Sequence, residues 1–387
     1  MKIAIGILKL QPRGGLEDHA LRIAAELSRR GHEVVLHTTG KLPDAGMPAI
    51  SLDRGARPLT NHGRVSAFAA DFARATASGY DRVVGFHPMP GLDVLFLADH
   101  LRNRPDAPLV KRLLPRFRAH ARLEASCFDE GATTRIMGLA HPQMRAFADR
   151  YPASRSRIVV LPPTITDARR KPHLRTAELR RETAVRLGIA GSRQTWLWLG
   201  LQPHIKGLDR VVEALAAVPE ATLLVGGITP GDRKLAAITS RAAQLAIAER
   251  IRWLGFMSDS DVPAAFAVAD VLAHPARVDV TGGVILEALT NGLPVVATDC
   301  CGFSTHVAAS GAGKVISAAF DPSAFVAALR AVCGPDNAEM SRRGVAYGES
   351  PDLFSGLAKA CDLIEAAEWP HEITLAGRPV PFEAAAQ

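Results

Sequence analysis

Buried strands and amphipathic helices alternate along this chain, and the alternation starts a second time near Thr195. Residues 2–10 form a continuous apolar run, and residues 16–30 then carry apolar side chains at helical spacing. The run HEVVLHTT follows and completes a β-α-β unit, which requires parallel strands. Further buried-strand runs are 81–86 and 157–163 before the restart, and 195–200, 222–227, 251–256, 270–275 and 293–298 after it. The predicted fold class is therefore α/β, with two doubly wound domains.

Two domains are also the natural number for 387 residues. The polar segment 166–182 is the best candidate linker, and we place an N-terminal domain at 1–167 and a C-terminal domain at 168–351. We expect the last apolar helix, at about 352–368, to pack back on the N-terminal domain. Residues 369–387 contain prolines and lack a clear period, which is typical of a tail.

The formal charge of +7 favours an anionic partner, and nucleic acid, a membrane surface and a phosphorylated substrate all qualify. The five cysteines include no C-x-x-C pair, and their odd number indicates a reducing compartment rather than a disulfide framework. We interpret the pair Cys300–Cys301 as buried packing, because it lacks zinc-ligand spacing. The N-terminus is typical of a first strand rather than a signal peptide, and no apolar run is long enough to span a bilayer. We therefore expect a cytoplasmic protein.

Two carboxylates flank a glycine pair in the stretch 278–296. Asp279 lies in a loop, Gly282–Gly283 precedes Val284 at a helix start, and Glu287 follows inside an apolar helix. A charge on an apolar helix face usually has a partner or a ligand, and such a glycine pair exposes backbone N–H groups to an anion. Glu287 can accept hydrogen bonds from vicinal ribose hydroxyls, and Asp279 would lie where a hexose presents its hydroxyls. The pattern favours a sugar nucleotide; the alternative is a surface aspartate and a helix glutamate at the domain edge.

Lys206 and Gly207 follow the strand 195–200 and open a helix. A lysine here can stabilise the negative charge that grows on a departing nucleoside diphosphate, and Arg169 and His204 could supplement it. The alternative is an ordinary surface lysine, although helix N-termini prefer acidic residues.

Gly14 and Gly15 lie between the first strand and the first helix, where backbone N–H groups could face an anion or a sugar. His19 follows one helical turn later and could contact a substrate. The absence of a G-x-G-x-x-G pattern here argues against a nicotinamide fingerprint. A tight turn and a solvated histidine are the alternatives.

Basic residues crowd the segment 102–122, and apolar residues are interleaved with them. This composition suits an anionic bilayer surface, whereas nucleic acid binding lacks an accompanying recognition motif. A solvated charged face is the alternative. The basic residues are Arg102, Arg104, Lys111, Arg112, Arg116, Arg118 and Arg122, and the apolar ones include Leu109, Val110, Leu113, Leu114 and Phe117.

Several segments together resemble one known family, and they are Thr60–Arg64, Asp81–Phe86, Met89–Val94, Leu161–Pro163 and Lys206–Gly207. Over roughly residues 1–365 the chain resembles the retaining glycosyltransferases of family 4, and within them the lipopolysaccharide core glucosyltransferases. The resemblance implies the GT-B architecture, in which two Rossmann-like domains face each other across an inter-domain cleft. It also implies a UDP-sugar donor, a heptose acceptor in the lipopolysaccharide inner core, retention of the anomeric configuration, and no cofactor or essential metal.

The resemblance implies roles for individual residues. The loop of Gly14 and Gly15 matches the loop that approaches the donor, Lys206 and Arg169 match contacts to the diphosphate, and Glu287 matches the ribose contact. Asp99 falls where the family has a polar residue that faces the cleft, and segment 102–122 matches the region that touches the membrane.

Three positions depart from the family pattern. Asp279 replaces a glutamate and is one methylene shorter, Ile205 replaces a basic residue, and His19 replaces an aspartate. The donor class is therefore better defined than the donor sugar, and galactose or an N-acetylhexosamine could replace glucose.

The predicted function is transfer of a hexose, most simply glucose, from a UDP-sugar to an inner-core heptose at the inner face of the inner membrane. The alternatives are another UDP-sugar with a different lipid-linked or glycan acceptor, a GT-B-like epimerase or phosphorylase, and an inactive membrane-bound scaffold. The candidate catalytic residues are Asp279, Lys206, His19 and Asp99. The candidate donor-binding residues are Gly14, Gly15, Arg169, Lys206, Gly282, Gly283, Val284 and Glu287.

Overall fold

The computed structural model describes residues 1–10, 14–39, 47–52, 58–189 and 194–369, and the backbone of 373–375 and 378–380. The chain divides into two compact units. The first unit is Met1–Thr164 with Phe354–Gln387, and the second is Ile165–Leu353. Residues 165–167 and 352–353, which the predicted boundaries assigned to the N-terminal domain, thus belong to the second unit.

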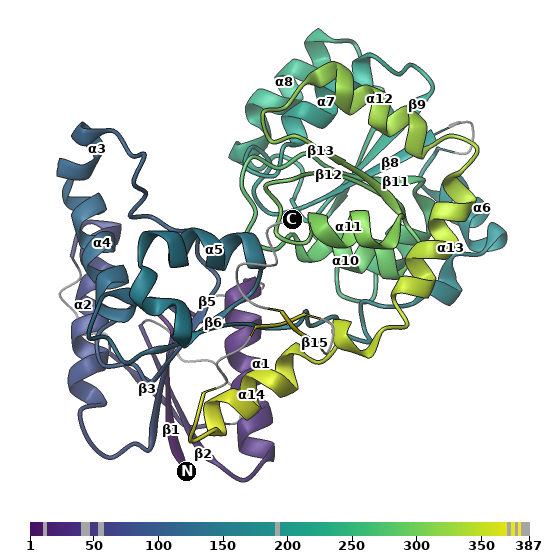
Figure 1. The fold of residues 1–387 in the computed structure, drawn as a ribbon. Coiled ribbons are helices and arrows are strands. Elements are labelled where there is room, and N and C mark those ends of the chain that lie inside the picture. Colours follow the sequence, from purple (N-terminus) through teal and green to yellow (C-terminus); the bar gives the residue numbers. More distant parts are fainter. Residues whose placement is uncertain are drawn as a thin grey trace. The chain divides into compact units, whose positions relative to one another are not determined.

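The first unit is a seven-stranded parallel sheet with helices on both faces (Figure 1). The strand order β3-β2-β1-β4-β5-β6-β7 is that of a Rossmann-like fold. The elements are β1 Lys2–Gly6, α1 Gly15–Arg29, β2 Glu33–Thr38, β3 Ala49–Ser51, α2 Asn61–Ala75, β4 Arg82–Gly85, β5 Val94–Leu97, α3 Leu109–Leu113, α4 Pro115–Phe128, β6 Arg135–Gly138, α5 His141–Arg150, β7 Ile158–Val160 and α14 Gly356–Glu365.

Each face of this sheet has its own hydrophobic core. Helices α1 and α14 cover one face, where Ile23 and Ile364 are buried with the strand residues. Helices α2, α4 and α5 cover the other face with Phe72, Phe128 and Phe147. Since the central strands are buried on both sides, their sequences are apolar throughout rather than alternating.

Helix α14 joins the first unit although the whole second unit precedes it in the chain. It packs against α1, and Arg30 at the end of α1 donates to Asp362 at 2.8 Å and to Glu365 at 2.7 Å. The apolar spacing near the end of the sequence predicts the helix α14, and its packing partner α1 lies near the start of the chain.

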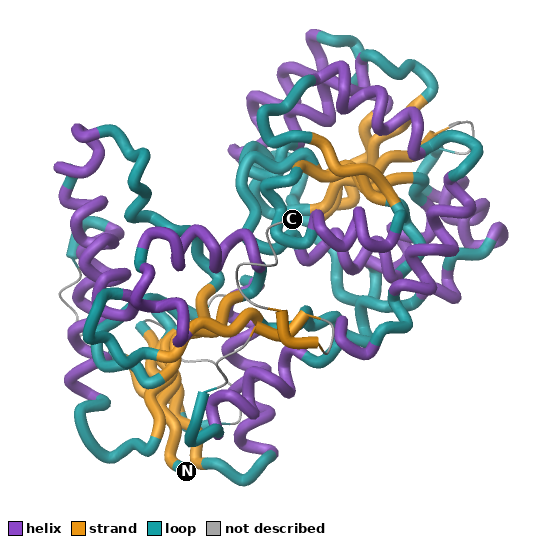
Figure 2. Tube along the Cα trace, viewed as in Figure 1, coloured by secondary structure: helices purple, strands orange, loops and turns teal. Residues whose placement is uncertain are grey.

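The second unit is a six-stranded parallel sheet of order β10-β9-β8-β11-β12-β13. Helices α7, α8 and α12 lie on one face, and α10 and α11 lie on the other (Figures 1 and 2). The elements are α6 Ala177–Arg186, β8 Gln194–Leu199, α7 Leu208–Ala216, β9 Ala221–Gly226, α8 Ala236–Gln244, β10 Ile251–Gly255, α9 Val262–Val268, β11 Val271–His274, α10 Gly283–Thr290, β12 Val295–Thr298, α11 Ser304–Ser310, β13 Gly313–Ile316, α12 Pro322–Val332 and α13 Asn337–Tyr347.

The fold confirms two doubly wound α/β domains, and it corrects the prediction of a linker at 166–182. That segment lies in the second unit and leads into α6. Its Arg175 is held by hydrogen bonds to the carbonyl oxygens of Phe266 and Ala269, so part of it is structural.

In the tail, β14 Ile373–Leu375 and β15 Arg378–Val380 form a short antiparallel pair that the aperiodic sequence did not predict. Among the helices of the described ranges, none is both long and apolar enough to cross a bilayer.

Candidate functional site

The strand order reverses between β8 and β11 of the second unit, and ligands of doubly wound sheets bind beyond the strand ends at such a point. The chain after β8 carries Lys206, and β11 ends at His274. Asp279 and Gly282 lie in the loop between β11 and α10. The topology therefore brings residues from two separate parts of the sequence to one edge of the sheet.

The turn at Lys206 is fixed by its backbone. Gly207 has φ +76°, and a Cβ there would lie 2.0 Å from the carbonyl oxygen of Pro275, so only glycine fits. The indole N–H of Trp198 donates to the Lys206 carbonyl at 3.0 Å. These constraints hold the backbone of the turn in one conformation, so the Lys206 side chain begins from a fixed position.

Asp279 accepts three hydrogen bonds. Its Oδ2 lies 2.6 Å from the Lys206 ammonium and 2.8 Å from Nε2 of His274, and its Oδ1 accepts from the Gly282 N–H at 2.9 Å. Burial opposes ionisation, but His274 and Lys206 outweigh it and hold the pKa of Asp279 well below its ordinary value. The residue is an ionised, buried carboxylate at neutral pH.

The N-terminus of α10 is open to an anion. Gly282 caps the helix with φ +73°, and the N–H groups of Gly283 and Val284, in its first turn, have no partner within the helix. The first turn carries no acidic residue, and a Cβ at Gly283 would meet no atom within 4 Å. A phosphate can therefore approach the backbone here.

Glu287 lies on the same helix and pairs with Arg169 at 3.3 Å. Arg169 also lies 2.8 Å from Asp259. Burial raises the pKa of Glu287, Arg169 lowers it and Asp259 raises it further. The two residues predicted to contact ribose and diphosphate thus contact each other.

Asn291 and His274 are two residues that the sequence reasoning missed. The Asn291 side chain donates to the carbonyl oxygens of Arg169 and Glu287 at 2.7 Å each and accepts from the Lys171 N–H, so it ties the Arg169 loop to α10. The Asn-Gly step after a helix could have suggested such a role. His274 ends an apolar strand, and the sequence alone predicts nothing more for it than a place in that strand.

Among the described contacts, the His204 ring makes none with Lys206 or Asp279. It is exposed, and its Nδ1 lies 3.8 Å from Asp209, which in turn pairs with Arg277 at 2.6 Å. Ile205, which stands where the resemblance implies a basic residue, is 41% exposed.

In the first unit, Gly14 caps α1 and Gly15 is its first residue. Glu17 and Asp18 occupy the first turn, which makes this helix N-terminus less favourable for an anion than that of α10. The ring of His19 lies 5.2 Å from that of Phe96, and burial lowers its pKa, so the imidazole is neutral at neutral pH.

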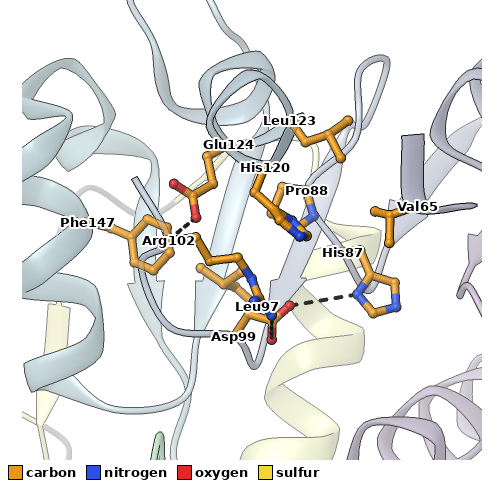
Figure 3. A pocket seen from close by; sticks show the side chains of 10 residues that line it. All are labelled: Val65, His87, Pro88, Leu97, Asp99, Arg102, His120, Leu123, Glu124 and Phe147. Carbon is orange, nitrogen blue, oxygen red and sulfur yellow. Dashed lines mark hydrogen bonds and ion pairs between the residues drawn. The ribbon is translucent and has the colours of Figure 1, made fainter. Parts of the chain in front are cut away.

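Asp99 follows β5 and lines a cavity of about 180 Å³ in the first unit (Figure 3). Its carboxylate lies 3.2 Å from Arg102 and 3.9 Å from His87. Burial alone would raise the pKa of Asp99, but His87 and Arg102 lower it to about 2. The cavity is completed by Val65, Pro88, Leu97, His120, Leu123, Glu124 and Phe147.

His274, Asp279 and Cys301 have ligand atoms within 4.8 Å of one another, which is a spacing a metal could use. The Lys206 ammonium, however, contacts the same Asp279 oxygen as His274. A metal cation bound here would be repelled by the Lys206 ammonium and would have to displace it. The donor set therefore suits an ion pair better than a metal.

Comparisons with known proteins identify the family of the chain. The family model of glycosyl transferases group 1 matches residues 180–348. The lipopolysaccharide glucosyltransferase WaaG of Escherichia coli (strain K12) is 32% identical over 376 residues, which cover 94% of this chain and 98% of that protein. A D-inositol 3-phosphate glycosyltransferase of Nocardia farcinica (strain IFM 10152) is 28% identical over 92% of this chain and 85% of its own length.

Solved structures give the same result. A crystal structure of WaaG matches with a TM-score of 0.83 at 31% identity, covering 94% of this chain and 100% of that one. Anabaena HepE in complex with UDP has a TM-score of 0.71 at 19% identity, covering 93% and 98%, and so shares the fold. The resemblance to family 4 and the GT-B fold are confirmed. The chain belongs to the glycosyl transferases of group 1, and it is a hexosyltransferase.

Proposed function

We propose that this hexosyltransferase moves a hexose from a UDP-sugar to a heptose of the lipopolysaccharide inner core, with retention of the anomeric configuration. The observation that carries the donor assignment is the cluster in which Lys206 lies beside the open N-terminus of α10. A lysine and backbone N–H groups together are the groups that a departing diphosphate requires. The acceptor assignment rests on the 32% identical relative that is a lipopolysaccharide glucosyltransferase.

In the proposed reaction, the acceptor hydroxyl attacks the anomeric carbon from the side of the leaving group. A new bond forms between that carbon and the acceptor oxygen, the bond to the diphosphate breaks, and a diphosphate oxygen takes the hydroxyl proton. Lys206 and the N–H groups of Gly283 and Val284 stabilise the charge on UDP. We assign no enzymic nucleophile. Since Lys206 supplies the positive charge, the reaction needs no metal ion.

Glu287 is proposed to receive the ribose hydroxyls and Arg169 to contact the diphosphate. When UDP binds, the Arg169–Glu287 ion pair would break and each side chain would contact UDP instead. Asp279 has its oxygens occupied by Lys206, His274 and Gly282, so a hexose hydroxyl must share one of them. This is the position at which a change of sugar preference is to be tested.

The cavity at Asp99 is proposed to hold one sugar ring of the acceptor (Figure 3). Its volume of about 180 Å³ is below the roughly 300–1,000 Å³ of pockets for larger ligands, so it suits one ring and not a nucleotide. The Asp99–Arg102 pair offers an acceptor and donors for hydroxyls, and Leu97 and Phe147 give an apolar wall. Burial and the charges of Arg102 and Arg116 lower the pKa of His120 to about 4, so its imidazole is neutral.

We propose that α3 and the start of α4 bind an anionic membrane at the inner face of the inner membrane. Leu109, Val110 and Leu113 are 76%, 75% and 74% exposed, an unusual set of apolar side chains beside the basic residues of segment 102–122. Leu113→Ser should weaken binding to phosphatidylglycerol-containing vesicles roughly 10- to 150-fold, because it removes about 1.5–3 kcal/mol of apolar burial. Val185→Ser, at a side chain 66% exposed in the second unit, is the matched control and should leave binding unchanged. Equal binding of all three proteins would contradict the membrane assignment.

The decisive experiment is a panel of UDP-sugars tested with truncated lipopolysaccharide acceptors, with the product linkage determined. Transfer from UDP-glucose with retention supports the proposal. Efficient transfer from UDP-galactose or a UDP-N-acetylhexosamine would correct the donor, and sugar turnover that persists without acceptor would indicate an epimerase. Asp99→Asn should raise the KM for the acceptor more than that for the donor.

A further inference from the structure

His274 is a buried polar residue whose presence in the core needs a reason. Its side chain is 1% exposed, its Nε2 lies 2.8 Å from Asp279, and its Nδ1 is buried without a hydrogen-bond partner among the described residues. A buried nitrogen without a hydrogen-bond partner destabilises the folded state. An apolar side chain at the end of β11 would avoid this cost, so the hydrogen bond to Asp279 must supply something other than stability.

That hydrogen bond determines where the Asp279 carboxylate points. Oδ1 is held by the Gly282 N–H, and Oδ2 is shared between His274 and Lys206. Without His274, Oδ2 would have only the flexible lysine as a partner. Because the carboxylate is almost fully buried, water could not replace the lost donor easily.

The same hydrogen bond controls where the lysine ammonium lies. Lys206 has a long side chain with several rotatable bonds, and its 2.6 Å contact with Asp279 is the ion pair the structure gives it. Asp279 is in turn tied to Gly282, the residue that caps α10. A chain of contacts therefore runs from His274 through Asp279 to the Lys206 ammonium and to the N-terminus of α10.

We infer that His274 is a positioning residue, which orients Asp279 so that the Lys206 ammonium is held beside the N-terminus of α10 before the diphosphate departs. The inference rests on the proposed role of Lys206 in stabilising UDP. His274 touches neither the sugar nor the diphosphate, and it acts only through Asp279. A zinc site made of His274, Asp279 and Cys301 is the competing interpretation, and the adjacent ammonium argues against it.

The test compares His274→Gln with His274→Asn. The glutamine amide nitrogen can reach the place of the imidazole Nε2, whereas the asparagine side chain is one methylene shorter. We expect H274Q to keep kcat within about fivefold of the wild type and H274N to lose roughly 10- to 100-fold, since a hydrogen bond to a charged group is lost. The KM for the UDP-sugar should change less than kcat in both. Equal losses in both variants, or none in either, would overturn the inference.

A double-mutant cycle separates positioning from general damage to the fold. In a Lys206→Ala background the asparagine substitution should cause little further loss of kcat, because the group it positions is gone. A full multiplicative loss would show that His274 acts independently of Lys206. Wild-type turnover by K206A would refute the role of Lys206 itself, whereas an impaired K206A with a normal H274N would refute only the role of His274. Inhibition by added zinc that H274Q and H274N both abolish would instead favour the metal site.

Discussion

The turn that carries Lys206 depends on a glycine, and replacing Gly207 with alanine gives a prediction whose size follows from the structure. A Cβ at this position would lie 2.0 Å from the oxygen and 2.8 Å from the carbon of the Pro275 carbonyl. Both atoms are backbone, so no side chain can rotate away. The residue also has φ +76°, which costs a non-glycine residue about 1–2 kcal/mol.

Gly231→Ala is the matched control, because Gly231 has φ +86° and open space around its would-be Cβ. It should lose only the conformational term of about 1–2 kcal/mol. Gly207→Ala adds the clash and should lose about 3–5 kcal/mol in total. At about 2–4 °C per kcal/mol for a unit of this size, the Tm of the second unit should fall by about 2–8 °C in the control and by about 6–20 °C in G207A.

Tryptophan fluorescence is a suitable assay, because Trp196, Trp198 and Trp253 all lie in the second unit. Turnover measured well below the Tm should fall strongly in G207A, since the displaced turn moves Lys206, and should stay normal in G231A. Equal Tm shifts in the two variants would refute the steric argument. A destabilised G207A with full turnover would show that the turn does not position the lysine.

Three further predictions follow from the described contacts. Glu287→Gln should weaken UDP binding about tenfold or more in calorimetry, because a charged acceptor of the ribose hydroxyls is lost, and unchanged affinity would remove Glu287 from the donor site. Burial lowers the pKa of His37 to about 4, against about 6.5 in the unfolded chain, so its contribution to stability is complete above pH 6.5 and about 3 kcal/mol is lost as the pH falls towards 4. Hydrogen exchange of the β2 segment at pH 7 and pH 4.5, corrected for intrinsic rates, measures this, and equal protection would contradict it. Finally, millimolar EDTA should leave the initial rate unchanged, and loss of activity that Mg²⁺ restores would refute the metal-free reaction.

The strands that the sequence predicted were those with long apolar runs. The structure confirms a strand within 195–200, because TWLWLG is buried on both faces of the sheet. It also contains β5 Val94–Leu97 and β13 Gly313–Ile316, which were missed. The second contains a lysine and an exposed valine at the sheet edge, so it lacks the continuous apolar run of a buried strand. The first is as long as β12 Val295–Thr298, which was predicted, so its length does not explain why it was missed.

The sequence indicated candidate site residues but not their contacts. Lys206, Asp279 and Glu287 were each identified from local chemistry, but the sequence assigned Lys206 and Asp279 to different parts of the donor. Their 2.6 Å ion pair arises because β8 and β11 are neighbours in the sheet, which depends on tertiary structure. His274 was missed for the same reason, since its only distinguishing feature is the carboxylate that the fold brings to it.

The return of α14 to the first unit has a consequence for synthesis on the ribosome. The second unit is continuous in sequence, so all its strands are present once residue 353 has emerged. The first unit begins the chain but is completed only by the last helix, and until then the apolar face of α1 around Ile23 and Leu27 lacks its partner. The C-terminal unit can therefore reach its final structure before the N-terminal one. The nascent chain therefore keeps the apolar face of α1 without this partner for most of its translation, and such exposed surface favours aggregation.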